Sequence, residues 1–253
     1  MTGVAKNTVV KLMVELGAKC VEYMNSHFVN LPCQRVQCDE IWTFLAAKQK
    51  NVTPALREKN PYAGDLWTWV AMDADTKLVC SWMVGSRDTH TAKLFIDDLA
   101  KRLANRVQLS TDGLKLYLFA VNSAFQGDID YGIVNKRYAG SVDETGSAPK
   151  YSPAKCIGCE KKVKVGDPDP KHINTSYIER QNLTMRMSMR RYTRLTNAFS
   201  KKVENHVASL AIHYMHYNYV RIHQTLRITP AMAAGLEQSP WTIEQLISLL
   251  GSH

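Results

Sequence analysis

The chain has 253 residues, of which 45% are hydrophobic, so it can build a substantial core and is not a disordered chain. Its 32 basic and 23 acidic residues give a net charge of +9, which favours a polyanion as partner. No apolar run approaches the roughly 20 residues of a membrane span, and the N-terminus lacks the apolar stretch of a secretory signal. We therefore expect a cytoplasmic protein without membrane association, whose six cysteines are reduced thiols.

The first predicted element is a helix over residues 4–26 with a broad apolar face. Residues 3–9 look like the turn and recognition helix of a helix-turn-helix, but the preceding helix of such a unit is absent. An ordinary amphipathic helix explains the spacing equally well. We interpret residues 1–34 as an N-terminal helical segment, the remnant of a helix-turn-helix.

The next part of the chain predicts an α/β domain. Its strand candidates are residues 35–46, 66–72, 78–84, 107–110 and 130–138. Helical patterns cover residues 89–104 and 114–125, between the later strands. Three antiparallel strands followed by αβ units predict a mixed sheet flanked by helices.

Residues 139–172 interrupt this pattern, because they are rich in Gly, Ser, Lys, Pro and Asp and hold few large apolar side chains. We interpret them as a mobile insertion or loop. The pattern from Thr175 to about Tyr219 is helical again. The domain then extends to about residue 236, and residues 237–253 form a short helical tail.

Three acidic residues are candidates for a catalytic metal site. Asp39 and Asp112 interrupt apolar, strand-like runs, and Glu179 opens a long segment that carries basic residues. Carboxylates are the usual ligands of Mg²⁺ and Mn²⁺, and two such cations can activate the attacking oxygen and stabilise the leaving oxygen of a phosphodiester. The trio therefore predicts a two-metal site for phosphoryl transfer on nucleic acid.

Other interpretations of these acids compete with the metal site. A single Asp at a strand end is more often a turn former or a helix cap than a ligand. Further acids could also take part: Glu40, Asp73, Asp75, Asp97 and Asp98. Alternation along a strand predicts that Glu40 lies on the opposite face from Asp39. The remaining four fall in a hairpin turn or on a helix.

The segment after Glu179 is predicted to contact the DNA backbone. Its seven basic residues are Arg180, Arg186, Arg190, Arg191, Arg194, Lys201 and Lys202. Three of the arginines repeat every four residues, so a continuous helix would place them on one face. Such contacts add salt-sensitive affinity without base preference. The alternative is a merely solvated basic face.

Two further groups could have a role at a site. Cys156 and Cys159 have the spacing of half a zinc knuckle, with His172 as a nearby third ligand, although paired thiols in a flexible insertion explain them better. The later histidines, which include His206 and His223, are interpreted as packing residues or DNA contacts rather than metal ligands.

Five motifs of the chain resemble the insertion-sequence transposases of the IS1 type, which belong to the DDE group and have a ribonuclease-H-like fold. They are Cys38–Trp42, Ser110–Gly113, Asn174–Asn182, Arg190–Arg194 and Tyr217–Leu226. The resemblance covers roughly residues 3–236 and implies a catalytic domain over residues 35–236. It also implies that Asp39, Asp112 and Glu179 are the catalytic acids.

The resemblance implies a function as well. The protein would be a DNA transposase that cleaves transposon-end DNA with Mg²⁺ or Mn²⁺ and joins the freed 3′-hydroxyl to target DNA. Arg180 could stabilise charge on the transferring phosphorus. The implied partners are double-stranded DNA, at the nucleoid, and further copies of the chain in a dimer or larger assembly. The alternatives are a ribonuclease-H-like nuclease without strand transfer and a DNA-binding relative that has lost catalysis.

The chain also differs from these relatives in two respects. Relatives carry a zinc-binding segment and a whole helix-turn-helix in a longer N-terminus, and the interval between their second and third acids is shorter.

Overall fold

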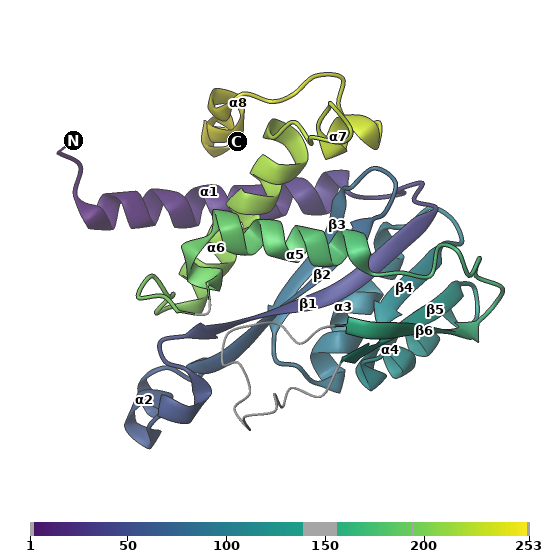
Figure 1. Ribbon diagram of the computed structural model, residues 1–253. Helices are drawn as coiled ribbons and strands as arrows, with labels where there is room; N and C mark the ends of the chain where they lie inside the picture. Colours follow the sequence, from purple (N-terminus) through teal and green to yellow (C-terminus); the bar gives the residue numbers. More distant parts are fainter. Residues whose placement is uncertain (1–2, 139–155, 194, 252–253) are drawn as a thin grey trace.

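The computed structural model describes residues 3–138, 156–193 and 195–251, and it shows a mixed sheet covered by helices on both faces (Figure 1). The strands are β1 (Arg35–Leu45), β2 (Gly64–Asp73), β3 (Val79–Gly85), β4 (Gln108–Asp112), β5 (Asp130–Tyr138) and β6 (Cys156–Val165). They lie in the order β3-β2-β1-β4-β5-β6, in which β1 is antiparallel to β2 and parallel to β4. The predicted mixed sheet flanked by helices is confirmed, and its strand order is compatible with a ribonuclease-H-like fold.

Helices α3 and α4 cover one face of the sheet, and α1, α5 and α6 lie on the other side (Figure 1). The helices are α1 (Lys6–His27), α2 (Pro54–Lys59), α3 (Thr89–Arg102), α4 (Lys115–Phe125), α5 (Ser176–Ser188), α6 (Val203–Met215), α7 (Pro230–Ala233) and α8 (Ile243–Ser248). Among the described residues, none of these helices has the length and apolar character that crossing a bilayer requires.

The centre of the fold is β1, which is buried on both faces. Val36, Cys38 and Ile41 have at most 1% of their surface exposed. On the α3–α4 side the core continues through Phe95 and Tyr117, which both pack against the ring of Trp69. A central strand that is covered on both sides cannot slip in register without exposing apolar side chains, so its polar residues are held at fixed positions.

The predicted loop over residues 139–172 is wrong for residues 156–165. Residues 156–165 form β6, which pairs antiparallel with β5 at the edge of the sheet. The strand was hidden from composition because its apolar residues are exposed: Ile157 is 65% exposed and Val163 is 52% exposed. An edge strand can remain mostly polar and still satisfy its backbone through the ladder. Residues 139–155 lie outside the described part of the chain.

The helical pattern predicted from Thr175 to about Tyr219 is interrupted, and the prediction that Arg186, Arg190 and Arg194 share a helix face is wrong. Helix α5 ends at Ser188, a short 3-10 turn follows at residues 190–192, and α6 begins at Val203. The break occurs because Tyr192 turns into the core, where its hydroxyl bonds to Thr68 Oγ1 (2.6 Å) and His206 Nε2 (2.9 Å). The three arginines at four-residue spacing therefore share no helix face, and the third of them, Arg194, lies outside the described residues.

Helix α1 belongs to the same core as the sheet, although its origin as part of a helix-turn-helix remains a prediction. Leu16, Cys20 and Met24 are buried, and α1 packs along α6. The two helices meet where Gly17 faces Ala208. A Cβ on Gly17 would lie 2.5 Å from the Cα of Ala208, so this close approach requires glycine.

We expect Gly17→Ala to lower the free energy of unfolding by about 1–3 kcal/mol, because the added methyl group pushes α1 away from α6. The gain in helix propensity from Gly to Ala, at most about 1 kcal/mol, works in the opposite direction. Chemical denaturation measures the difference. Gly158→Ala is the matched control, because a Cβ there meets nothing within 4 Å. A neutral or stabilising Gly17→Ala would show that α1 is not docked on α6 in this way.

Candidate metal centre

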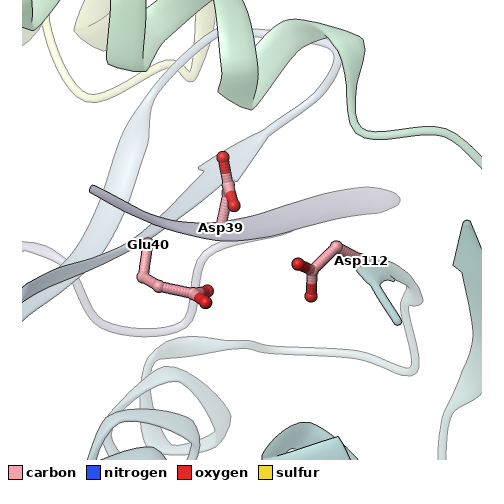
Figure 2. Close-up of side chains that lie close together, drawn as sticks. All are labelled: Asp39, Glu40 and Asp112. Carbon is pink, nitrogen blue, oxygen red and sulfur yellow. The ribbon is translucent and has the colours of Figure 1, made fainter. Parts of the chain in front are cut away.

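The sheet itself brings Asp39 and Asp112 together. The parallel pairing of β1 with β4 runs from Arg35↔Gln108 to Gln37↔Ser110, and each aspartate lies two residues beyond the last pair on its strand. Asp39, Glu40 and Asp112 each offer a carboxylate oxygen, and these three oxygens all lie within 4.8 Å of one another (Figure 2). Among the described residues, this is the one group of three or more potential metal ligands.

The exclusion of Glu40 from the site is wrong. Asp39 and Glu40 do leave β1 on opposite sides, as strand geometry requires, but the longer Glu40 side chain turns its carboxylate toward Asp112 (Figure 2). Alternation along a strand sets the direction of the Cα–Cβ bond. It does not set the position of the carboxylate at the end of a glutamate side chain. The only signal in the sequence was that Glu40 directly follows Asp39.

Glu40 is held by two partners from distant segments. Arg87, in the loop between β3 and α3, pairs with its carboxylate at 2.6 Å, and Tyr117 on α4 donates its hydroxyl at 3.1 Å. The Glu40 side chain is only 1% exposed. Burial and the nearby Asp112 raise the pKa of Glu40, while the bonds from Arg87 and Tyr117 lower it. These partners fix the carboxylate at the edge of the cluster.

Helix α5 is placed over Asp39 by a side chain of β1. The Gln37 Oε1 atom accepts hydrogen bonds from the backbone N–H groups of Tyr177 (3.0 Å) and Ile178 (3.1 Å), in the first turn of α5. This satisfies donors that no helical partner reaches. Further along α5, Asn182 donates its Nδ2 to Asp39 Oδ2 at 2.8 Å. Neither contact has a local sequence signal, because both join residues about 140 positions apart.

Glu179 lines the same cavity as Asp39 and Asp112 but is not part of the three-acid group. This cavity, which we call the acidic cavity, has a volume of about 530 Å³ and is also lined by Arg87 and Lys136. On its wall, the Glu179 carboxylate accepts hydrogen bonds from Thr175 Oγ1 (2.6 Å) and from Lys136 of β5, with which it forms an ion pair. The structure thus brings the predicted trio to one cavity, while Glu40 joins Asp39 and Asp112 in the carboxylate cluster and is not among the residues that line the cavity.

The electrostatics of the cluster favour a cation. Burial, followed by the charges of Glu40 and Asp112, raises the pKa of Asp39 to about 7, although hydrogen bonds from the backbone of Glu40 and from Asn182 lower it. Several carboxylates at this separation repel one another when all are charged. Carboxylate oxygens are also the ligands that Mg²⁺ and Mn²⁺ prefer. The cluster could therefore hold a divalent metal ion.

The predicted DNA-binding residues lie in different environments. Arg180, Arg190, Lys201 and Lys202 are exposed, and Arg186 is partly buried. Arg191 is half-buried, and its guanidinium donates to Ser200 Oγ (2.8 Å) and to the carbonyl of Asn205 (3.3 Å), so it holds the segment before α6 in place. Contact with DNA remains a prediction for the basic residues of this segment.

The remaining sequence candidates are separate from the cavity. Cys159 is exposed on β6, whereas the side chain of Cys156 lies outside the described part. Cys159 pairs with Lys136 in the ladder, and His172 instead lies beside Arg35, at the start of β1. Zinc binding by this pair remains a prediction. His206 is fully buried, and its hydrogen bonds to Tyr192 and Ser200 identify it as a packing residue.

No family model and no curated protein match the chain. Among solved structures, it is similar to a piggyBac transposase, in the cryo-EM structure of a synaptic complex with hairpin DNA, with a TM-score of 0.35 and 11% sequence identity. The match covers 87% of this chain and 52% of that one, so the chain spans about half the length of the transposase chain. A similarity at this level bears on neither the reaction nor the partners of this chain.

We expect Arg87→Met to lower the free energy of unfolding by about 1–2 kcal/mol, because it leaves Glu40 buried without its cation. The value is below that of a fully buried pair because the Arg87 side chain is 40% exposed. Adding Glu40→Gln should recover part of the loss, and a double-mutant cycle at neutral pH measures the coupling. Lys162→Met, in the exposed pair with Glu160, is the control. Additive effects of the two substitutions would contradict a coupled Arg87–Glu40 pair.

We expect the acidic cluster to give opposite effects of pH with and without a cation. The pKa of Asp39 is higher in the folded chain than in the unfolded chain, so without metal this group makes folding less stable as pH rises from about 4 to about 7. Asp39→Asn should therefore stabilise the metal-free protein at pH 8, by roughly 1–3 kcal/mol. Mg²⁺ should raise the unfolding temperature of the wild type more at pH 8 than at pH 6.

Thermal unfolding with Mg²⁺ or with EDTA tests both effects. Asp39→Asn should also lose most of the Mg²⁺ effect, whereas Glu58→Gln, which removes an exposed acid of α2, should change neither. Equal stabilisation of wild type and Asp39→Asn by Mg²⁺ would place the metal elsewhere.

Proposed function

We propose that this chain is a DNA transposase of the DDE type, which cleaves transposon-end DNA and joins the freed 3′-hydroxyl to target DNA. The observation that supports it most is the convergence of three acids, Asp39, Asp112 and Glu179, on one cavity at the centre of a ribonuclease-H-like sheet. The net charge of +9 suits a nucleic-acid substrate. The motif resemblance to IS1-type transposases points to the same reaction.

In this proposal Asp39 and Asp112 would hold the cations, Glu40 would add a carboxylate oxygen from the same cluster, and Glu179, which lines the cavity, would complete a second site. A bound pair of divalent cations would supply activation of the attacking oxygen and stabilisation of the leaving oxygen. Asn182 orients Asp39 through its 2.8 Å hydrogen bond. Lys136 neutralises Glu179 while no cation is beside it.

The arginine at the reacting phosphate is Arg87 rather than Arg180 in this proposal. Arg87 lines the acidic cavity and is held by Glu40, and its guanidinium lies 4.7 Å from the ring centroid of Trp67. It is therefore a fixed positive charge beside the carboxylates, where charge builds up on the phosphoryl oxygens. Arg180, by contrast, lines a different cavity.

The wider organisation of the protein is part of the same proposal. Residues 35–236 form the catalytic domain, residues 1–34 an N-terminal helical segment, and residues 237–253 a helical tail. Exposed basic residues of the segment that follows Glu179 hold the DNA backbone without reading bases. Dimers or larger assemblies bring two transposon ends together.

We expect the purified protein to nick supercoiled plasmid DNA with Mg²⁺ or Mn²⁺ and to be inactive in EDTA. Asp112→Asn should reduce cleavage by two orders of magnitude or more, because it removes a charge that holds the metals. Glu58→Gln, in an exposed acid outside the cavity, and Cys156→Ser should cleave like the wild type. Cleavage that persists in Asp112→Asn would overturn the proposal.

Strand transfer needs its own measurement. Labelled duplexes that carry the DNA flanking the coding sequence should become covalently joined to a plasmid, and the joined product is read on a denaturing gel. Metal-dependent cleavage without any joined product would identify a nuclease instead. DNA binding without cleavage by the wild type would identify a non-catalytic relative.

A further inference from the structure

A second cavity lies on the other side of α5 from the acidic cavity. It has a volume of about 310 Å³ and is bounded by α5, the turn between β2 and β3, and the segment after α6. We call it the basic pocket and define it by Lys77, Tyr177, Arg180, Gln181, Arg221 and His223. Glu179 lines the acidic cavity and Arg180 lines the basic pocket, so consecutive residues of α5 face the two sites.

The positive charge of the basic pocket is only partly offset by acids of the described chain. Its lining holds Lys77, Arg180 and Arg221 and no carboxylate, and neither arginine forms an ion pair with any described acid. The charges of Asp73 and Asp75 act on Lys77, but both acids also have other partners. Asp75 pairs with Arg35, and Asp73 accepts hydrogen bonds from its own turn, including one from Thr76 Oγ1 (2.6 Å). The pocket is therefore a concentrated site of positive charge.

Lys77 is fixed in the wall of the pocket. It is only 9% exposed, and its ammonium lies 3.3 Å from the ring centroid of Tyr177 and donates to the carbonyl of Ala74. An ammonium has three N–H donors, and the carbonyl accepts one of them. A buried lysine is costly unless something compensates its charge, and the ring face does so only in part. A ligand that brings negative charge would complete its environment.

The pocket also contains a buried donor without an acceptor. Gln181 is 3% exposed, and its Nε2 has no hydrogen-bond partner among the described residues, and the same is true of His223 Nδ1. An unsatisfied buried donor costs about 1–3 kcal/mol. The positive field of the pocket is also visible at His223, whose pKa is lowered by burial first and then by Lys77 and Arg221. Cations and an unsatisfied amide donor around one space suit an anion rich in oxygen.

We propose that the basic pocket binds a backbone phosphate of the DNA strand, at a position separate from the phosphate that reacts in the acidic cavity. This inference rests on the proposed function, which supplies DNA as the ligand. A phosphodiester presents acceptor oxygens in the geometry that guanidinium groups bind well, and the cavity can hold it with part of a sugar. A strand that crosses the first turns of α5 would meet Glu179 on one side and Arg180 on the other.

The test compares the double variant Arg180→Gln/Arg221→Gln with Lys101→Gln/Lys115→Gln, which also removes two positive charges. Lys101 is an exposed residue of α3, on the opposite face of the sheet, and Lys115 starts α4 on that face. Both arginines of the test variant are exposed, so the fold should be retained, and thermal unfolding in chloride checks this. Fluorescence anisotropy of a labelled DNA duplex in EDTA, over a range of NaCl concentrations, gives affinity without cleavage.

We expect the arginine double variant to bind DNA about 10-fold more weakly at fixed salt, and its slope of log K against log salt to fall by about 0.9, the value for one phosphate. The lysine double variant should keep the wild-type slope. An unchanged slope in the arginine variant, or a fall of about 1.8 that indicates two separate phosphates, would overturn the single-phosphate pocket.

A second arm separates DNA from a free anion. Thermal unfolding in sodium phosphate and in sodium chloride of equal ionic strength measures binding of inorganic phosphate. Inorganic phosphate could stabilise the wild type but not the arginine variant, while the arginine variant keeps the wild-type slope of log K against log salt for DNA. That result would assign the pocket to a free anion and refute the DNA contact. Asp112→Asn should bind DNA with the wild-type slope. If the wild type does not cleave DNA but the arginine variant still shows the expected fall in the salt slope, only the proposed reaction is refuted, and the phosphate pocket stands.

Discussion

The site depends on the parallel pairing of β1 with β4. Parallel neighbours require a crossover connection, here the path through β2, β3 and α3, so two aspartates 73 positions apart in the chain emerge at the same point of the sheet. Because β1 is buried on both faces, its register against β4 cannot change without moving apolar side chains into water. The position of Asp39 beside Asp112 is therefore determined by the core rather than by any attraction between the two acids.

The acids themselves oppose this arrangement. Asp39 and Glu40 have raised pKa values because they are buried near other carboxylates, and the chain compensates with neutral and cationic partners around the edge of the cluster. Asn182 bonds to Asp39, and Arg87 bonds to Glu40. These contacts orient the oxygens but leave negative charge directed into the cavity. The repulsion between these buried carboxylates lowers the stability of the fold, and a bound cation would remove it. Such an arrangement is typical of a binding site rather than of a group that stabilises the fold.

The sequence predicted the centre of the fold better than its edges. The range 130–138 predicted for β5 agrees with the structure, and the first strands differ by a few residues, because their apolar patterns reflect burial. Strand β6 was missed because an edge strand needs backbone pairing more than apolar side chains. The break after Ser188 was missed because it depends on Tyr192, whose buried hydrogen bonds to Thr68 and His206 have no local signature.

The same difference between local and long-range information applies to the site. Asp39, Asp112 and Glu179 could be chosen because topology alone brings strand ends and a following helix together, whereas the contribution of Glu40 depends on Arg87 and Tyr117, which local sequence patterns do not connect to it.

Helix α5 shows most clearly how the two cavities are related. Gln37 anchors its first turn to β1, two residues before Asp39, so the helix keeps a fixed rotation over the sheet. With that rotation set, Glu179 faces the carboxylates and Arg180 faces the basic pocket. One short helix thus separates a site of concentrated negative charge from one of concentrated positive charge. In the proposed function, one DNA strand crosses α5 and contacts both sites. Its phosphates would be repelled by the acidic cavity unless cations were bound there. Metal binding in the acidic cavity and DNA binding in the basic pocket would therefore favour each other.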